Sequence, residues 1–279
     1  MTDAKTRPSQ RARADRFRAL HKGPASFVIA NPWDAGSARV LAGLGFKALA
    51  TSSGGFAGTM GRRDGAVTRA EALAHARAVC DAVDLPVSAD LEGGFGHQPA
   101  DMAETVRLAA QTGLVGCSIE DFTGDARKPF YDVGAAAERI AAAAEVAASF
   151  GFDFILTARS ECFLRGNPDL DEVIARLLAY EAAGADVLMA PGLPDLVAVK
   201  AVCDALSKPF NFMAGMPGKS FSVAQLADAG VRRISLATSL YRAAMSGLIA
   251  AASEVQESGA FGYVDSSIPG PELAGFMRG

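Results

Sequence analysis

The chain has 279 residues, and 50% of them are hydrophobic, so it can bury the core of one large domain. Its 27 Lys and Arg residues against 31 Asp and Glu give a formal net charge of −4, which argues against a nucleic-acid partner. The N-terminus has no long apolar run that could serve as a signal peptide or membrane span. Four scattered cysteines without a CxxC pair favour reduced thiols, so we expect a cytoplasmic protein without a membrane partner.

From residue 25 onward, short apolar runs alternate with longer segments of helical period. Strands are predicted at residues 27–30, 48–52, 86–90, 116–120, 154–159, 186–189, 210–213 and 233–236. Helices are predicted at residues 35–44, 69–83, 99–112, 134–150, 170–183, 193–206, 222–229 and 239–258. Eight strand-then-helix units predict a (β/α)₈ TIM-type barrel, with an open doubly wound sheet as the alternative.

No linker or low-complexity segment divides the chain, so residues 1–279 are expected to form a single barrel domain. Residues 1–24 are expected to form an N-terminal helix or arm. Residues 260–279, with several glycines and prolines, are expected to form an irregular C-terminal tail.

The third predicted strand ends in two carboxylates, Asp90 and Glu92, followed by a glycine-rich stretch to Gly96. Side chains two residues apart on an extended strand share a face, so both carboxylates are expected to point the same way. Two like charges held together call for a positive group between them, and a hard divalent cation such as Mg²⁺ suits oxygen ligands. The alternative is a solvated strand end followed by a glycine-rich turn.

In a barrel of this kind, functional residues lie at the C-terminal ends of the strands. The residues of interest at these predicted ends are Asn31, Asp34, Ser52, Ser53, Gly54, Asp90, Glu92, Glu120, Asp121, Arg159, Glu161, Asn211, Ser235 and Thr238. Carboxylates, an arginine and a Ser/Gly turn therefore converge on one rim.

Four stretches are similar to the isocitrate lyase/phosphoenolpyruvate mutase superfamily: residues 51–64 (TSSGGFAGTMGRRD), 89–96 (ADLEGGFG), 118–121 (SIED) and 158–163 (ARSECF). The resemblance runs from about residue 17 to residue 245. It implies a (β/α)₈ barrel whose last helix is exchanged between subunits, in a homodimer or homotetramer. It also implies a Mg²⁺ or Mn²⁺ cofactor and a small 2-oxo-acid substrate.

The resemblance assigns the metal site by position. Asp90 resembles the direct metal ligand, whereas Glu92 and Glu120 resemble acids that hold metal-bound waters. Asp64 resembles an acid that supports this water shell, and we count Asp64 and Glu120 among the expected catalytic residues. Glu92 replaces the second Asp of the family's DxDxGxG motif, which keeps the charge but lengthens the side chain.

The substrate site is assigned in the same way. Ser52, Ser53 and Gly54 resemble a turn whose hydroxyl and amide groups receive the substrate carboxylate, as successive backbone N–H groups can do. Arg159 resembles a guanidinium that grips a carboxylate or phosphonate with two parallel hydrogen bonds, and we expect it to act in both binding and catalysis. Asn211, at the end of the seventh predicted strand, is expected to bind substrate.

Simpler roles remain open for several of these residues. Asp64 could be a turn residue, and Glu120 and Arg159 could form a structural ion pair. Asn31 and Asp34 are better explained as caps of the helix that follows them than as substrate contacts.

The segment at residues 121–131 departs from the family pattern. It lacks the Lys-Lys/Arg-Cys-Gly-His motif whose cysteine serves the isocitrate and methylisocitrate lyases as acid or base. Thr123, Asp125, Lys128 and Tyr131 are the groups available to replace it, and Lys128 is expected to be catalytic. The mutase histidine after the sixth strand is also absent, because Pro191 stands there.

Together these features predict a Mg²⁺-dependent carbon–carbon lyase or decarboxylase that acts on a small 2-oxo or 2-hydroxy acid through an enolate. One alternative is a mutase or hydrolase of C–P bonds in phosphonopyruvate-like compounds. Another is a 2-oxo-acid binder without catalytic activity.

Overall fold

The computed structural model describes residues 7–277, and within them eight parallel strands form one sheet. These strands are β1 (Phe27–Ile29), β2 (Leu49–Ala50), β3 (Val87–Asp90), β4 (Gly116–Glu120), β5 (Ile155–Arg159), β6 (Val187–Met189), β7 (Phe210–Met213) and β8 (Arg233–Ser235). From β2 to β8 each strand pairs with its neighbour in sequence, and β8 also pairs with β1. A parallel bridge between Ala30 and Leu49 connects the β1 edge to β2, so the sheet closes as the predicted (β/α)₈ barrel.

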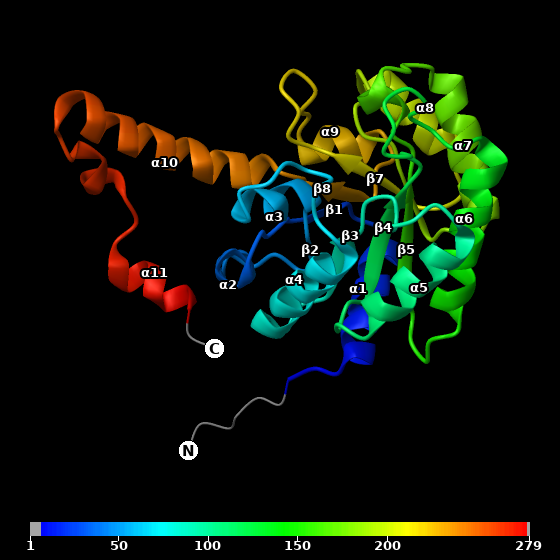
Figure 1. Ribbon diagram of the computed structural model, residues 1–279, viewed down its shortest axis with the longest axis horizontal. Coiled ribbons are helices and arrows are strands. Elements are labelled where there is room, and N and C mark those ends of the chain that lie inside the picture. The colour runs from blue at the N-terminus through cyan, green and yellow to red at the C-terminus, as the bar shows by residue number, and fades with distance from the viewer. Residues whose placement is uncertain (1–6, 278–279) are drawn as a thin grey trace.

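Helices follow the strands and surround the barrel (Figure 1). The helices are α1 (Gln10–Lys22), α2 (Ala35–Gly43), α3 (Ser53–Thr59), α4 (Arg69–Ala82), α5 (Pro99–Ala110), α6 (Val133–Ala148), α7 (Leu170–Ala182), α8 (Leu196–Ala205), α9 (Val223–Asp228), α10 (Ser239–Ser258) and α11 (Gly270–Phe276), with 3₁₀ helices η1 (Cys162–Arg165) and η2 (Gly262–Ser266).

Helix starts follow local capping chemistry. Asp34 caps α2, as the sequence predicted, by accepting a hydrogen bond from the backbone N–H of Ser37 at 2.6 Å. At the start of α4, the Thr68 hydroxyl accepts from the N–H of Glu71 while the Glu71 carboxylate accepts from the N–H of Thr68. These reciprocal bonds satisfy N–H groups that the helix itself cannot.

Helix α1 covers the N-terminal end of the barrel. Phe17 of α1 is fully buried and packs in a cluster with Val115, Ile155 and Val187 at the start of the strands. The N-terminal end is therefore filled with apolar side chains.

Two sequence predictions about local structure are wrong. The Ser/Gly stretch after β2 is not only a turn: α3 begins there, capped by the Ser52 hydroxyl, which accepts from the N–H of Gly55 at 3.3 Å. The C-terminal stretch is not irregular, because η2 and α11 form within it. Phe276 of α11 occupies the space beside Gly43, so α11 packs against α2.

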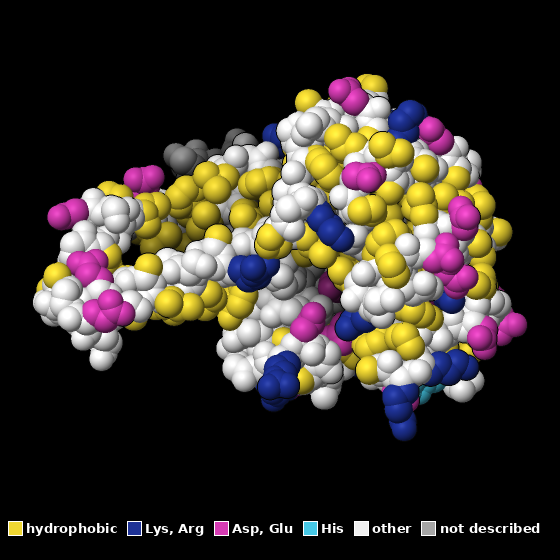
Figure 2. Space-filling view, turned by 90° about the horizontal axis from the view of Figure 1, so that it is seen from above, with side chains coloured by type: hydrophobic (Ala, Val, Ile, Leu, Met, Phe, Trp, Pro, Cys, Tyr) yellow, Lys and Arg dark blue, Asp and Glu magenta, His cyan; other side chains and the backbone are white. Residues whose placement is uncertain are grey.

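Helix α10 extends away from the barrel as an arm, and α11 returns from its far end toward α2 (Figure 1). None of its 20 residues is buried, and Leu248 and Ile249 are 60% and 64% exposed. Apolar side chains also gather along the arm in the space-filling view (Figure 2). Within residues 7–277, no helix has both the length and the apolar character needed to cross a membrane.

Candidate active site

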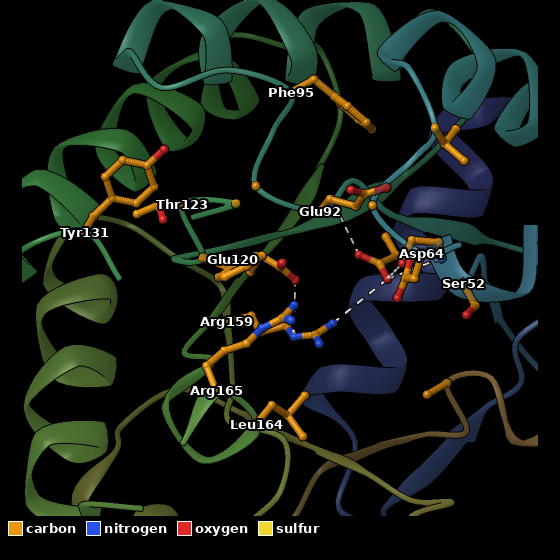
Figure 3. Close-up of a pocket in the computed structure, with 18 of the residues that line it drawn as sticks. Ser52, Asp64, Glu92, Phe95, Glu120, Thr123, Tyr131, Arg159, Leu164 and Arg165 are labelled. Atoms are coloured by element: carbon orange, nitrogen blue, oxygen red, sulfur yellow. Dashed lines mark hydrogen bonds and ion pairs between the residues drawn. The ribbon is translucent and has the colours of Figure 1, made fainter. Parts of the chain in front are cut away.

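A cavity of about 630 Å³ lies at the C-terminal ends of the strands. Figure 3 shows it in close-up, with the carboxylates of Asp64, Glu92 and Glu120 and the guanidinium of Arg159 facing the same space. Its polar and charged lining residues are Ser52, Ser53, Asp64, Asp90, Glu92, His97, Glu120, Thr123, Tyr131, Arg159, Arg165 and Thr238. The structure therefore brings together most of the residues that the sequence singled out.

Asp90 is the last residue of β3 and is held on both sides. Its backbone N–H donates to the Thr51 hydroxyl at 3.1 Å, and its Oδ2 accepts from the Ser53 hydroxyl at 2.9 Å. Its Oδ1 accepts from the N–H of Glu92 at 3.2 Å. These bonds fix the carboxylate toward the cavity between the ends of β2 and β3.

Glu92 reaches the cavity by a different route from the one predicted. It does not continue an extended strand, because its φ of 50° lies in the left-handed region that few non-glycine residues adopt. The turn, and not the alternation of a strand, therefore directs its side chain.

The carboxylates raise one another's proton affinity. Burial raises the pKa of Glu92 to about 7, and the neighbouring charges of Asp90 and Asp64 add to this effect. Burial, and then the charge of Asp90, also raises the pKa of Asp64. The ionised cluster is therefore short of positive charge.

Arg159, the last residue of β5, supplies the positive charge nearest to these acids. Its Nε lies 3.6 Å from Glu120, its Nη1 lies 3.9 Å from Asp90, and its Nε also donates to Glu161. Burial raises the pKa of Glu120 although Arg159 opposes that shift. Burial disfavours the charge of Arg159, but Glu161, Glu120 and Asp90 together raise its pKa above the usual value. The Arg159–Glu120 ion pair considered from sequence thus exists, inside the cavity.

The donor set fits a hard divalent cation bound largely through water. Within residues 7–277, no three His, Cys, Asp or Glu side chains come close enough to form a direct metal cage. Mg²⁺ rarely uses such cages, because it keeps several waters and binds through one or two carboxylates. Asp90 as direct ligand, with Glu92 and Glu120 holding waters, fits this chemistry, and a cation would relieve the repulsion that raises the carboxyl pKa values.

Three predicted site residues do not line this cavity: Lys128, Asn211 and Gly54. The Lys128 side chain is 71% exposed, its Nζ lies 3.7 Å from Asp132, and it is not among the residues that line the cavity. Asn211 is fully buried and lines a smaller cavity of about 50 Å³ inside the barrel. There its Oδ1 accepts from Nε of Arg233 at 2.7 Å, and its Nδ2 donates to the Ser235 hydroxyl at 3.1 Å.

Gly54 lies beside the site and cannot carry a side chain without movement of its neighbours. An added Cβ would stand 2.9 Å from Cγ2 of Thr238 and 3.1 Å from Oδ2 of Asp64.

The expectation that Asn31 caps α2 is wrong. Its Nδ2 donates to the carbonyl of Thr51 at 3.1 Å and its Oδ1 accepts from the N–H of Leu236 at 2.8 Å, so it ties three strand ends together.

The sequence reasoning missed Arg165 and Arg139. Arg165 lines the cavity from η1, where its Nε lies 3.3 Å from Glu161 and its guanidinium lies 3.7 Å from the centre of the Phe122 ring. Arg139 lies on α6 and donates to the carbonyls of Gly96 and His97 at 2.9 Å each. No local motif marks either residue.

The closed barrel and the acid-lined cavity at its C-terminal rim define a (β/α)₈ protein with an enzyme-like site. The family model of phosphoenolpyruvate phosphomutase matches residues 17–256, so the chain belongs to this family. The resemblance to the isocitrate lyase/phosphoenolpyruvate mutase superfamily is thereby confirmed, and the members of this superfamily include lyases and mutases.

The chain is similar to several known proteins. It is 47% identical to a lyase/mutase candidate from Burkholderia cenocepacia J2315, whose crystal structure matches with a TM-score of 0.95 over 97% of each chain. It is 30% identical to 2-methylisocitrate lyase of Escherichia coli over 69% of this chain and 67% of that enzyme. It is 28% identical to oxaloacetate decarboxylase of Pseudomonas paraeruginosa over 82% of this chain and 80% of that enzyme.

Proposed function

We propose that this protein is a Mg²⁺- or Mn²⁺-dependent lyase or decarboxylase that cleaves a carbon–carbon bond of a small 2-oxo or 2-hydroxy acid. The observation that carries the proposal is the cluster of Asp64, Asp90, Glu92 and Glu120, with Arg159 as its immediate counter-charge. The methylisocitrate lyase and oxaloacetate decarboxylase relatives, whose names denote carbon–carbon bond cleavage, support this reaction class.

The four acids have three proposed roles around the cation. Asp90 would bind it directly, Glu92 and Glu120 would hold its waters, and Asp64 would orient that water shell. When bound, the cation supplies Lewis-acid stabilisation for the negative charge that develops as the bond breaks. The Ser53 hydroxyl, which donates to Asp90 at 2.9 Å, keeps this carboxylate oriented before the substrate arrives.

The remaining polar groups would bind the substrate. The stretch from Ser52 to Gly54 would receive one substrate carboxylate, and its backbone approaches the site closely because Gly54 lacks a side chain. Arg159 would grip a carboxylate through its planar guanidinium. Glu161, fully buried beside Nε of Arg159, holds the guanidinium in place.

A second candidate is chemistry on a C–P bond, because the matching family model is that of a phosphomutase. Release of phosphate from phosphonopyruvate would favour this reading. Tight binding of 2-oxo acids without turnover would instead favour a binding protein.

We further propose a homo-oligomer in which α10 is exchanged between subunits. The arm leaves the barrel with none of its residues buried, and it exposes Leu248 and Ile249. Burial of these side chains against a second copy would remove apolar surface from water. Sedimentation equilibrium tests this, since a monomer at all concentrations would contradict it.

The decisive experiment for the function is a calorimetric titration with oxalate, a planar mimic of the pyruvate enolate, with and without Mg²⁺. We expect Mg²⁺-dependent binding that Asp90→Ala abolishes. Asp132→Ala is the matched control, since it removes a carboxylate that is 85% exposed at a position outside the cavity lining. Equal binding with and without Mg²⁺, or unchanged binding in Asp90→Ala, would refute the metal site. Metal-dependent binding would justify a turnover screen of 2-oxo acids, malates and phosphonates.

A further inference from the structure

The lining of the cavity contains few groups that could carry a proton to or from a substrate carbon. Its four carboxylates surround the proposed cation site, and its arginines stay protonated. The titratable groups that remain in this lining are His97 and Tyr131, which hydrogen-bond each other at 2.6 Å between Nδ1 and the phenol oxygen. The two side chains therefore form a coupled pair on the cavity wall.

Arg139 holds both members of this pair. Its side chain is buried, and its Nη1 donates to the carbonyls of Gly96 and His97 at 2.9 Å each. The same guanidinium lies 4.0 Å from the centre of the Tyr131 ring. One buried cation thus fixes the glycine-rich turn after β3 and the face of the tyrosine together.

Tyr131 stands at the anchored base of the segment that follows β4. Its N–H donates to the carbonyl of Asp121 at 3.3 Å, and its carbonyl accepts from Nη1 of Arg176 at 2.9 Å. The Asp121 carboxylate accepts from the Tyr180 hydroxyl at 2.6 Å inside the core. The backbone of Tyr131 is therefore anchored to two buried residues, Asp121 and Arg176, as positioning of a group at a reacting atom requires.

The position of Tyr131 suits a substrate held by the acids. In Figure 3, Tyr131 stands on the wall across the cavity from Asp64 and Ser52, with Glu120 and Arg159 between. Burial raises the pKa of Tyr131, although the charge of Arg139 opposes this shift, so its hydroxyl is neutral and able to donate at neutral pH. A substrate bound at the acids would thus have a proton donor on its far side.

We propose that Tyr131 is the catalytic proton-transfer residue of this site, that His97 relays its proton, and that Arg139 positions both. This inference rests on the proposed function. In the direction of enolate formation, a C–H proton passes to the Tyr131 oxygen while the hydroxyl proton moves to Nδ1 of His97. The C–H electron pair becomes the carbon–carbon double bond of the enolate, and His97 becomes an imidazolium. The reverse transfer protonates the enolate carbon that cleavage of a carbon–carbon bond leaves behind.

The test is the exchange of pyruvate methyl protons for deuterium in D₂O with MgCl₂, followed by proton NMR. We expect exchange by the parent protein, a loss of at least about 100-fold in Tyr131→Phe, and a loss of at least about 10-fold in His97→Asn. The asparagine retains a hydrogen-bond acceptor but cannot relay a proton. Tyr263→Phe, a tyrosine of η2 outside the cavity lining, is the matched control and should exchange like the parent.

Oxalate titration of the same variants separates proton transfer from structure. Affinity in the presence of Mg²⁺ should match the parent in Tyr131→Phe and His97→Asn, which also shows that both variants are folded. An exchange rate in Tyr131→Phe equal to that of the parent would overturn the inference. A loss of oxalate affinity large enough to account for the whole loss of exchange would overturn it too. Absence of exchange in a parent that binds oxalate with Mg²⁺ would overturn the inference but not the proposed metal site. Failure of the parent to bind oxalate would refute the proposed function itself.

Discussion

Glu92→Gln in the Mg²⁺-free protein should change how stability depends on pH. Burial and the charges of Asp90 and Asp64 raise the pKa of Glu92 from 4.5 to about 7 in the folded protein. A carboxyl that binds its proton more tightly when folded stabilises the protein below the unfolded pKa, and this contribution is lost as pH rises through the folded pKa. The parent should therefore lose stability between about pH 4.5 and pH 7, whereas the variant should lack this component of the loss.

The size of the effect follows from the pKa difference. At about 1.36 kcal/mol per pKa unit, the interval from 4.5 to about 7 sets an upper limit of ~3.4 kcal/mol. Glu92 is only partly buried, so water screens its interactions, and we expect ~1–2 kcal/mol. At pH 8 the variant should be more stable than the parent by this amount, and the difference should largely disappear near pH 4.5.

Urea unfolding in EDTA from pH 4.5 to pH 8 measures this difference, because the groups outside the carboxylate cluster titrate alike in both proteins. Mg²⁺ should restore stability to the parent at pH 8 more than to the variant, since the cation favours the ionised carboxylate. A difference in unfolding free energy that stays constant with pH, or that favours the parent at pH 8, would refute the electrostatic account of this cluster.

Three further substitutions test the packing and binding assignments. Arg159→Lys keeps a positive charge among the acids but loses the planar guanidinium, so calorimetry should show oxalate affinity at least about 10-fold weaker. Affinity equal to that of the parent would exclude two parallel hydrogen bonds from Arg159 to the ligand carboxylate. Tyr180→Phe removes the hydroxyl that donates to Asp121 and should lower the free energy of unfolding in urea by ~1–3 kcal/mol, whereas an unchanged midpoint would contradict that hydrogen bond. Gly43→Ala places a Cβ about 2.5 Å from the Phe276 ring, so α11 should detach from α2. Limited proteolysis should then remove the C-terminal segment faster than in the parent. Cleavage at the same rate as in the parent would show that the position of α11 does not depend on this contact.

Much of the fold followed from local patterns. The alternation of apolar runs and helical segments located all eight strands, and β4 and β7 begin and end at the predicted residues. The polar residues that follow those runs met at one rim because parallel strands in a barrel all end at the same face. The cluster of Asp90, Glu120 and Arg159 was therefore predictable without any knowledge of side-chain contacts.

Other parts of the site depend on contacts between distant segments. The Lys128 side chain lies beside Asp132 and outside the cavity lining, and Asn211 is held by Arg233. Neither arrangement can be read from neighbouring residues. Arg139 bonds to carbonyls more than 40 residues earlier in the chain, and no local spacing signals such a partner.

The sequence by itself determined the order of the strands, the face on which they end and the chemical types gathered there, because hydrophobic period and chain direction act over a few residues at a time. Only the tertiary structure decided how those groups are aimed. The left-handed backbone of Glu92 and the pairing of His97 with Tyr131 arise when separate segments pack together. Packing selects backbone angles and side-chain orientations that the local sequence leaves open.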